Sequence, residues 1–171
     1  NEDLLEILDG IYDASPSVIE DLNAETRFIE RFYMNILGRP ADEVGLGDWL
    51  GVINAESASA VALGFFNSAE FKNKELDDAA FVDTLYRALF YRAGDEDGTS
   101  YWLQQLSSGK LRDMVIWGFL RAEEFQTLSG SLGVTAATAA DDLSFGVRAL
   151  IERLYTVVLK RQPDQAGFDG W

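Results

Sequence analysis

Adjacent pairs of apolar residues recur every four positions in three segments of the sequence. Pairs at i and i+1, then at i+4 and i+5, place a broad apolar stripe on a helix and cannot lie on one face of a strand. We therefore predict amphipathic helices at 28–37, 81–90 and 150–159. The paired residues are Phe28, Ile29, Phe32, Tyr33, Ile36 and Leu37; Phe81, Val82, Leu85, Tyr86, Leu89 and Phe90; and Leu150, Ile151, Leu154, Tyr155, Val158 and Leu159.

A motif begins at one tyrosine of each predicted helix. Arginine stands six residues after the tyrosine, aspartate nine, glycine twelve and tryptophan sixteen. Five positions held at one spacing in three places indicate an array of repeats. The copies are Tyr33, Arg39, Asp42, Gly45 and Trp49; Tyr86, Arg92, Asp95, Gly98 and Trp102; and Tyr155, Arg161, Asp164, Gly167 and Trp171.

Each predicted helix ends within this motif, and another helix begins there. In the first copy Gly38 suits a helix C-terminus, and Pro40 disfavours helix in the residue before it. The aspartate is placed to cap the next helix by accepting from the free amides of its first turn. The glycine three residues later has no Cβ, so we expect this helix to lie close to the preceding one.

A second segment recurs after the first two copies of the motif. It contains a glycine within an apolar helix, which costs about 1 kcal/mol relative to alanine, so its recurrence predicts close helix packing. The segment comprises Val61, Gly64, Phe65, Phe66, Ala69, Glu70 and Phe71, and then Val115, Gly118, Phe119, Leu120, Glu123, Glu124 and Phe125.

These patterns predict an all-α fold of tandem helical repeats, with two to three helices per unit, packed as one bundle-like array. Residues 24–76 form repeat one, 77–125 repeat two, and 148–171 a truncated repeat three. A short amphipathic helix is predicted within residues 1–23, where it could be the end of an upstream unit.

Residues 126–147 interrupt the spacing of the repeats. Tyr86 follows Tyr33 by 53 residues, but Tyr155 follows Tyr86 by 69. The excess coincides with a stretch rich in Ser, Thr, Gly and Ala, which predicts a linker, or an extra helix capped by Thr135.

Repeat three stops at its tryptophan, whereas repeat one continues from Trp49 to Phe71. We therefore expect the apolar stripe of repeat three to be only partly covered within this chain. Either the chain is a fragment of a longer array, or a homo-oligomer forms in which a second chain completes the unit. An opening of Asn-Glu-Asp, without a basic n-region, is not a signal peptide and suggests a processed chain or an excised fragment.

The amino-acid composition limits the partners that the protein can bind and the chemistry that it can carry out. A net charge of −15 and a pI near 4.2 leave little room for a basic groove that could bind nucleic acid, and they oppose binding to anionic membranes. The chain has no Cys and no His, which excludes disulfides, thiolate chemistry and the commonest general base. The apolar runs fall short of the ~20 residues of a membrane span.

The first repeat resembles a bacterial helical repeat family, domain of unknown function 4214. The residues that carry the resemblance are the string from Phe28 to Asp42, then Gly45 and Trp49, and later Gly64-Phe65 and Ser68 to Phe71. The resemblance covers residues 27–125 and 148–171. It implies a non-catalytic helical module found in tandem in surface-layer, RTX-type and other secreted proteins, often with calcium-dependent neighbours. The expected location is therefore extracellular or at the cell surface.

A more distant likeness is to the helical domain of phycobilisome linkers, which share the rhythm from the tyrosine to Leu-x-Arg-x-Pro. Those linkers tend to be basic, and a net charge of −15 weighs against this alternative. The second copy departs from the family pattern because Tyr91-Arg92-Ala93-Gly94 replaces Gly-Arg-x-Pro. This replacement affects the expected loop conformation but not the register.

Calcium is the one ion whose binding the sequence leaves open, and no other cofactor is predicted. The candidate ligands are the acidic residues of the motif loops: Asp42, Asp95, Asp97 and Asp164. An EF-hand aligned on Gly98 fails, because Ala93 and Gln104 occupy its first and twelfth positions. Helix capping is the favoured role of these aspartates.

The repeated arginines and tryptophans are candidates for binding an anionic or glycan ligand: Arg39, Trp49, Arg92, Trp102, Arg161 and Trp171. The favoured interpretation is structural, since an arginine at a helix C-terminus pairs with nearby acids and aromatic residues at these positions are usually core. Hydrolysis by a pair of carboxylates is the one enzyme class that the composition leaves open. A catalytic pair would occur once, whereas the prominent acids recur with the fold, and no G-x-S-x-G or phosphate-loop motif is present, so no enzyme activity is predicted.

We therefore predict a structural, assembly or anchoring segment. Its partners would be other domains of the same large protein, or a surface glycan or protein. One alternative is a glycan- or protein-binding module, with or without calcium, and a second is a scaffold similar to the phycobilisome linkers.

Overall fold

The computed structural model describes residues 23–169, and these contain helices and turns but no strand. The all-α prediction is confirmed for this part of the chain. The helix predicted within residues 1–23 lies outside the described residues, apart from Asn23, which caps the first described helix. Trp171 also lies outside them.

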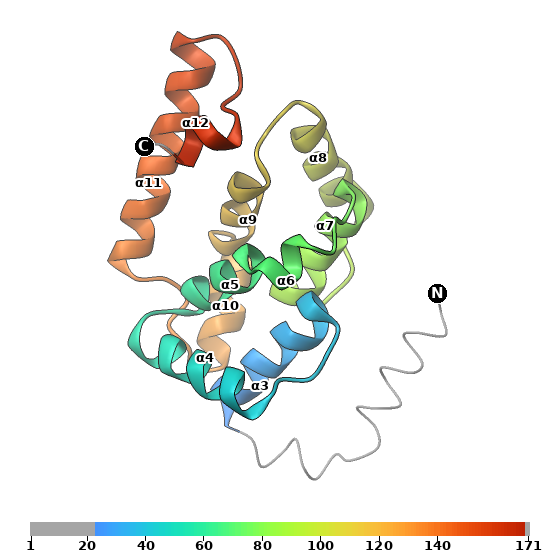
Figure 1. Ribbon diagram of the computed structural model, residues 1–171, viewed down its shortest axis with the longest axis vertical. Helices are drawn as coiled ribbons and strands as arrows, with labels where there is room; N and C mark the ends of the chain where they lie inside the picture. Colours follow the sequence, from blue (N-terminus) through green and yellow to red (C-terminus); the bar gives the residue numbers. More distant parts are fainter. Residues whose placement is uncertain (1–22, 170–171) are drawn as a thin grey trace.

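Each unit begins with an α-helix that passes directly into a π-helical turn, followed by the remaining helices of the unit (Figure 1). Repeat one comprises α3 (Ala24–Phe32), η1 (Tyr33–Leu37), α4 (Glu43–Ala55), α5 (Ala58–Asn67) and α6 (Ala69–Lys72). Repeat two comprises α7 (Asp78–Leu85), η2 (Tyr86–Phe90), α8 (Glu96–Ser107), α9 (Arg112–Leu120) and α10 (Glu123–Ser131). The third unit comprises α11 (Ala139–Arg153), η3 (Leu154–Val158) and α12 (Gln165–Asp169).

The residue five positions after the motif tyrosine has a left-handed backbone in all three units. Its φ is 75° at Gly38, 61° at Tyr91 and 55° at Lys160. Left-handed φ suits glycine and is unfavourable for other residues. The second copy nevertheless keeps both the register and the loop conformation of the first, although tyrosine replaces glycine there.

Repeats one and two share a single apolar core. The stripe residues of α3 and α7 are buried in it together with the aromatic residues of the second segment, and η1 contacts η2. Phe65 of α5 packs edge-on against Phe32, with ring centroids 5.7 Å apart. The predicted close packing around Gly64 and Gly118 is confirmed, because the indole of the motif tryptophan lies over each glycine.

Residues 126–147 hold the end of α10, a loop and the first part of α11. The loop lies against repeat one: the amide of Ala58 donates to the Thr135 carbonyl at 2.8 Å, and the Ser59 amide donates to the Ala136 carbonyl at 3.0 Å. Buried Val134 belongs to the shared core.

The prediction that Thr135 caps a helix here is wrong. Thr138 caps α11 in a capping box with Asp141. Thr135 instead lies in the segment that accepts from the first amides of α5, so the helix cannot begin until after that segment.

The third unit is attached to repeat two through α9 and the turn before it. A small separate cluster joins Met114 to Ile151 and Tyr155. Lys110 Nζ pairs with Glu152 at 2.7 Å, and a second ion pair joins Arg148 to Asp113. In Figure 1, α11 and α12 accordingly stand at one side of the array.

Candidate functional site

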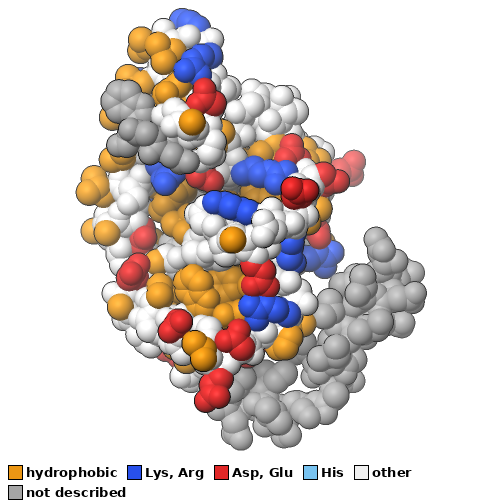
Figure 2. Space-filling view, viewed as in Figure 1, with side chains coloured by type: hydrophobic (Ala, Val, Ile, Leu, Met, Phe, Trp, Pro, Cys, Tyr) orange, Lys and Arg blue, Asp and Glu red, His pale blue; other side chains and the backbone are white. Residues whose placement is uncertain are grey.

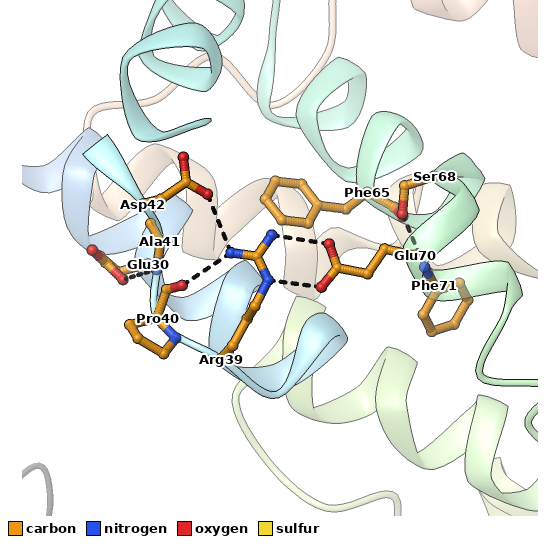
Figure 3. Close-up of polar contacts among 9 residues, drawn as sticks. All are labelled: Glu30, Arg39, Pro40, Ala41, Asp42, Phe65, Ser68, Glu70 and Phe71. Atoms are coloured by element: carbon orange, nitrogen blue, oxygen red, sulfur yellow. Dashed lines mark hydrogen bonds and ion pairs between the residues drawn. The ribbon is translucent and has the colours of Figure 1, made fainter. Parts of the chain in front are cut away.

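The motif arginine of repeat one is surrounded by protein acceptors (Figure 3). Arg39 Nε and Nη2 donate to the two carboxylate oxygens of Glu70, at 2.7 and 2.9 Å. Nη1 donates to the Pro40 carbonyl and to Asp42 Oδ2, both at 3.3 Å. The guanidinium also lies over the Tyr33 ring, 4.9 Å from its centroid. This arginine therefore joins the end of η1, the following loop and α6.

Repeat two reproduces the same network. Arg92 Nε and Nη2 donate to Glu124 at 2.7 and 2.9 Å. Nη1 donates to the Ala93 carbonyl at 3.1 Å and to Asp95 Oδ2 at 3.2 Å. The prediction that these arginines pair with nearby acids is confirmed, and the partners are now identified.

Sequence reasoning placed Glu70 and Glu124 in the second segment but did not assign them to the arginines. The glutamate follows its arginine by 31 residues in repeat one and 32 in repeat two. That near-constant separation is the signal that could have found the pair.

The motif aspartates cap the helices that follow them, as predicted. Oδ1 of Asp42 accepts from the Gly45 amide at 2.9 Å, and Oδ1 of Asp95 accepts from the Gly98 amide at 2.8 Å. In the third unit Asp164 accepts from the Gly167 amide at 2.7 Å. The amide hydrogen bond, together with the neighbouring arginine, lowers the pKa of each aspartate below its ordinary value.

Glu70 and Arg39 also hold each other in their charged forms. The hydrogen bonds from Arg39 lower the pKa of Glu70, and those to Glu70 raise the pKa of Arg39. The pair therefore remains ionised throughout the neutral range.

The tyrosine and tryptophan of the motif pack against the two repeated glycines. A Cβ built on Gly45 would lie 2.1 Å from the Tyr33 hydroxyl, and one on Gly64 would lie 2.2 Å from the Trp49 ring. The Trp49 ring also stacks on Phe65, with centroids 4.7 Å apart. The motif aromatics of repeats one and two are therefore packed within their own repeat, with both tryptophans half-buried.

Three of the four aspartates proposed as metal ligands lie in separate loops, and the fourth is Asp97. Asp97 is an exposed residue in the first turn of α8 and is not part of the cap. Within the described residues, no group of three or more acidic side chains is placed to hold a metal ion. Asp42, Asp95 and Asp164 each stand in a different unit.

The third unit repeats only part of the network. Arg161 Nη1 donates to Asp164 Oδ2 at 3.3 Å and to the Gln162 carbonyl at 3.4 Å. Its guanidinium lies over the Tyr155 ring, 4.7 Å from the centroid. Among the described residues, no glutamate takes the place that Glu70 and Glu124 occupy beside the other two arginines.

The apolar stripe of the third unit is exposed on one side, as the sequence predicts. Leu150 is 57% exposed, Leu154 41% and Val158 66%, whereas the equivalent residues of repeats one and two are at most 2% exposed. Figure 2 shows apolar side chains along the outer edge of the molecule over α11. We use the name α11 face for the exposed apolar side of α11 and η3, formed by Leu143, Val147, Leu150, Leu154 and Val158.

The family model described as "Domain of unknown function (DUF4214)" matches the chain twice, at residues 14–75 and 62–129. The two matches cover the first two copies of the motif and of the second segment. No curated protein and no solved structure matches the chain. Within residues 23–169, the helices are all too short or too polar to cross a membrane.

Proposed function

Since the chain belongs to the DUF4214 family of domains of unknown function, we propose that it is a non-catalytic helical repeat module. Its role is structural: it forms a segment of a larger bacterial protein, secreted or attached to the cell surface, and it supports assembly or anchoring. The partners are other domains of the same protein, or a protein or glycan of the surface.

One observation carries this proposal: the repeated charged groups bind each other within each repeat. Four of the five N–H groups of Arg39 donate to protein acceptors, and Arg92 makes the same four bonds. Asp42 accepts with one oxygen from the backbone and with the other from Arg39. A motif whose polar atoms are already bonded serves to hold helices together rather than to bind a ligand.

The net charge of −15 fits a saline environment or cationic partners better than anionic ones. Such a charge keeps a module soluble and separate from its neighbours by self-repulsion, and salt screens that repulsion. The charge also excludes nucleic acid as a partner on electrostatic grounds.

Thermal unfolding in excess calcium and then in chelator, at constant ionic strength, tests this proposal. We expect no change in Tm, because the motif aspartates serve as caps. A site saturated at 100 times its Kd would instead add about 2.7 kcal/mol to the free energy of unfolding. A large rise in Tm that disappears in Asp95→Asn would overturn the structural role in favour of a calcium-dependent binding module. Asn caps a helix as well as Asp does, so this variant removes charge and keeps the cap.

A second measurement addresses the glycan alternative. Screening against surface glycans with the unmodified chain and with Trp102→Ala separates the two roles. The structural role predicts that Trp102→Ala lowers the Tm. Glycan binding that is lost in this variant at unchanged Tm would make the tryptophan a binding platform.

A further inference from the structure

We propose that the α11 face binds a helical partner segment of the type formed by α5 and α6. Such a segment has the pattern Val-x-x-Gly-Phe, then four residues, then Glu-Phe, which occurs at 61–71 and again at 115–125. The inference rests on the proposed function, because it treats the third unit as a repeat of the same module.

The equivalent faces in the first two repeats show which helix covers this stripe. Phe65 of α5 contacts the Tyr33 ring, with centroids 4.9 Å apart and an edge-on geometry. Phe119 of α9 contacts Tyr86 at the same distance and with a similar geometry. Tyr155 occupies this position in the third unit, where it is already buried with Met114 and Ile151. Leu154 is the counterpart of Phe32, which Phe65 contacts edge-on in repeat one, and Leu154 is 41% exposed. A phenylalanine from the partner segment therefore has a defined place against Leu154.

The charged part of the network points to the same occupant. In repeats one and two, Nε and Nη2 of the arginine bind the glutamate of the covering segment. The hydrogen bonds of Arg161 to described residues use Nη1 alone. A covering segment with the same pattern brings its glutamate to Nε and Nη2, and a bidentate pair of this kind also fixes orientation.

A second copy of this chain does not offer such a segment. Both of its copies are already packed in their own repeats, where Phe65 and Phe119 are each 1% exposed. Contact between two α11 faces would cover the leucines but would bring no carboxylate to Arg161. An exposed apolar stripe, beside an arginine whose Nε and Nη2 have no partner among the described residues, therefore favours a partner segment that carries both Phe and Glu.

The experiment adds a labelled synthetic peptide of residues 57–73 to the full chain and measures binding by fluorescence anisotropy. We expect saturable binding with one peptide per chain, lost in Leu154→Asp. Val44→Asp is the matched control, since Val44 is an exposed apolar residue on α4 of repeat one, and it leaves binding unchanged. The Tm of each variant shows that it is folded.

Reversing the charges of Arg161 and of the peptide glutamate tests whether these two groups form the proposed ion pair. The peptide with Glu70→Arg binds the unmodified chain about tenfold more weakly or worse. The same peptide regains affinity for the chain with Arg161→Glu. Failure of this rescue overturns the proposed pairing.

Sedimentation velocity without peptide tests the competing occupant. We expect a monomer. A dimer that Leu154→Asp converts to monomer, without any binding of the peptide, shows that a second copy covers the face and overturns the inference. Absence of peptide binding also overturns it, whereas the proposed structural role stands as long as Trp102→Ala lowers the Tm.

Discussion

The first helix of repeat two and that of the third unit carry the same apolar pattern but meet different surroundings. Leu85 and Leu154 occupy the same position in their repeats, yet Leu85 is completely buried and Leu154 is 41% exposed. Repeat two has α9 and α10 to cover the stripe, and the described part of the third unit has no counterpart. An amphipathic pattern thus specifies which face is apolar, and a separate segment, distant in sequence, decides whether that face is buried.

The largest expected difference in stability is the one between truncations of these two leucines. Leu85→Ala should reduce the free energy of unfolding by about 2 to 5 kcal/mol, because it leaves a cavity in the shared core. Leu154→Ala should change it by no more than about 0.5 kcal/mol, as for an exposed site. Urea unfolding of both variants measures the difference, and similar losses at the two positions would contradict the comparison.

Two glycines extend the comparison, one in the helix α9 that covers the stripe of repeat two and one in the partly uncovered helix α11. A Cβ on Gly118 of α9 would lie 2.4 Å from the Trp102 ring, so Gly118→Ala should destabilise by about 1 to 3 kcal/mol through overpacking. Gly146 of α11 has no atom within 4 Å of that position. Gly146→Ala should therefore stabilise the protein by roughly 1 kcal/mol through helix propensity. Urea unfolding of both variants measures these changes. A change in the free energy of unfolding that has the same sign in both variants would refute this distinction.

Replacing the motif arginines of repeat two and of the third unit should change stability by amounts that differ less than those of the glycine variants. Arg92→Ala removes the bidentate pair with Glu124 and should reduce stability by about 1 kcal/mol, the upper end for a solvent-exposed pair. Arg161→Ala removes only the longer contact to Asp164 and should have a smaller effect. Thermal unfolding compares them directly. High salt should narrow the gap, since it screens exposed ion pairs.

Acid should give the smallest and most graded effect. The pKa of Glu70 is lowered from its ordinary value near 4.5, and that of Asp42 from one near 3.8. Their stabilising contribution is therefore complete above these values and is lost as the pH falls through the lower pKa values of the folded state. Glu70→Gln should flatten the loss of Tm between neutral pH and acid. An unchanged slope would show that the Arg39 pair does not contribute.

The sequence predicted the elements whose causes are local. The stripes predicted the helices, and the spacing of Asp42 to Gly45 predicted a cap and a close helix contact. Tyr91 was different, since a tyrosine gives no sign of a left-handed backbone, and only its register with Gly38 indicates it. The pairing of Arg39 with Glu70 joins residues 31 apart, so it depends on how α6 folds back rather than on any local pattern.

The attachment of the third unit was also beyond local reasoning. The ion pair of Lys110 with Glu152 spans 42 residues, and neither side chain belongs to the motif. Likewise, the role of Thr135 follows from contact with α5 and not from its own neighbours. Helix propensity and spacing describe one segment at a time, whereas these contacts arise from the tertiary arrangement.

The loop between α10 and α11 has a consequence for how the protein folds. In a linear array each unit contacts only its neighbours, so units can fold one at a time from either end. Here the hydroxyl of Ser59 donates to the Ala136 carbonyl across 77 residues, and the loop completes the start of α5. The start of α5 in repeat one therefore has its full set of hydrogen bonds only when the segment after repeat two is in place. We therefore expect repeats one and two to unfold together as one cooperative unit, because separating them would break these hydrogen bonds.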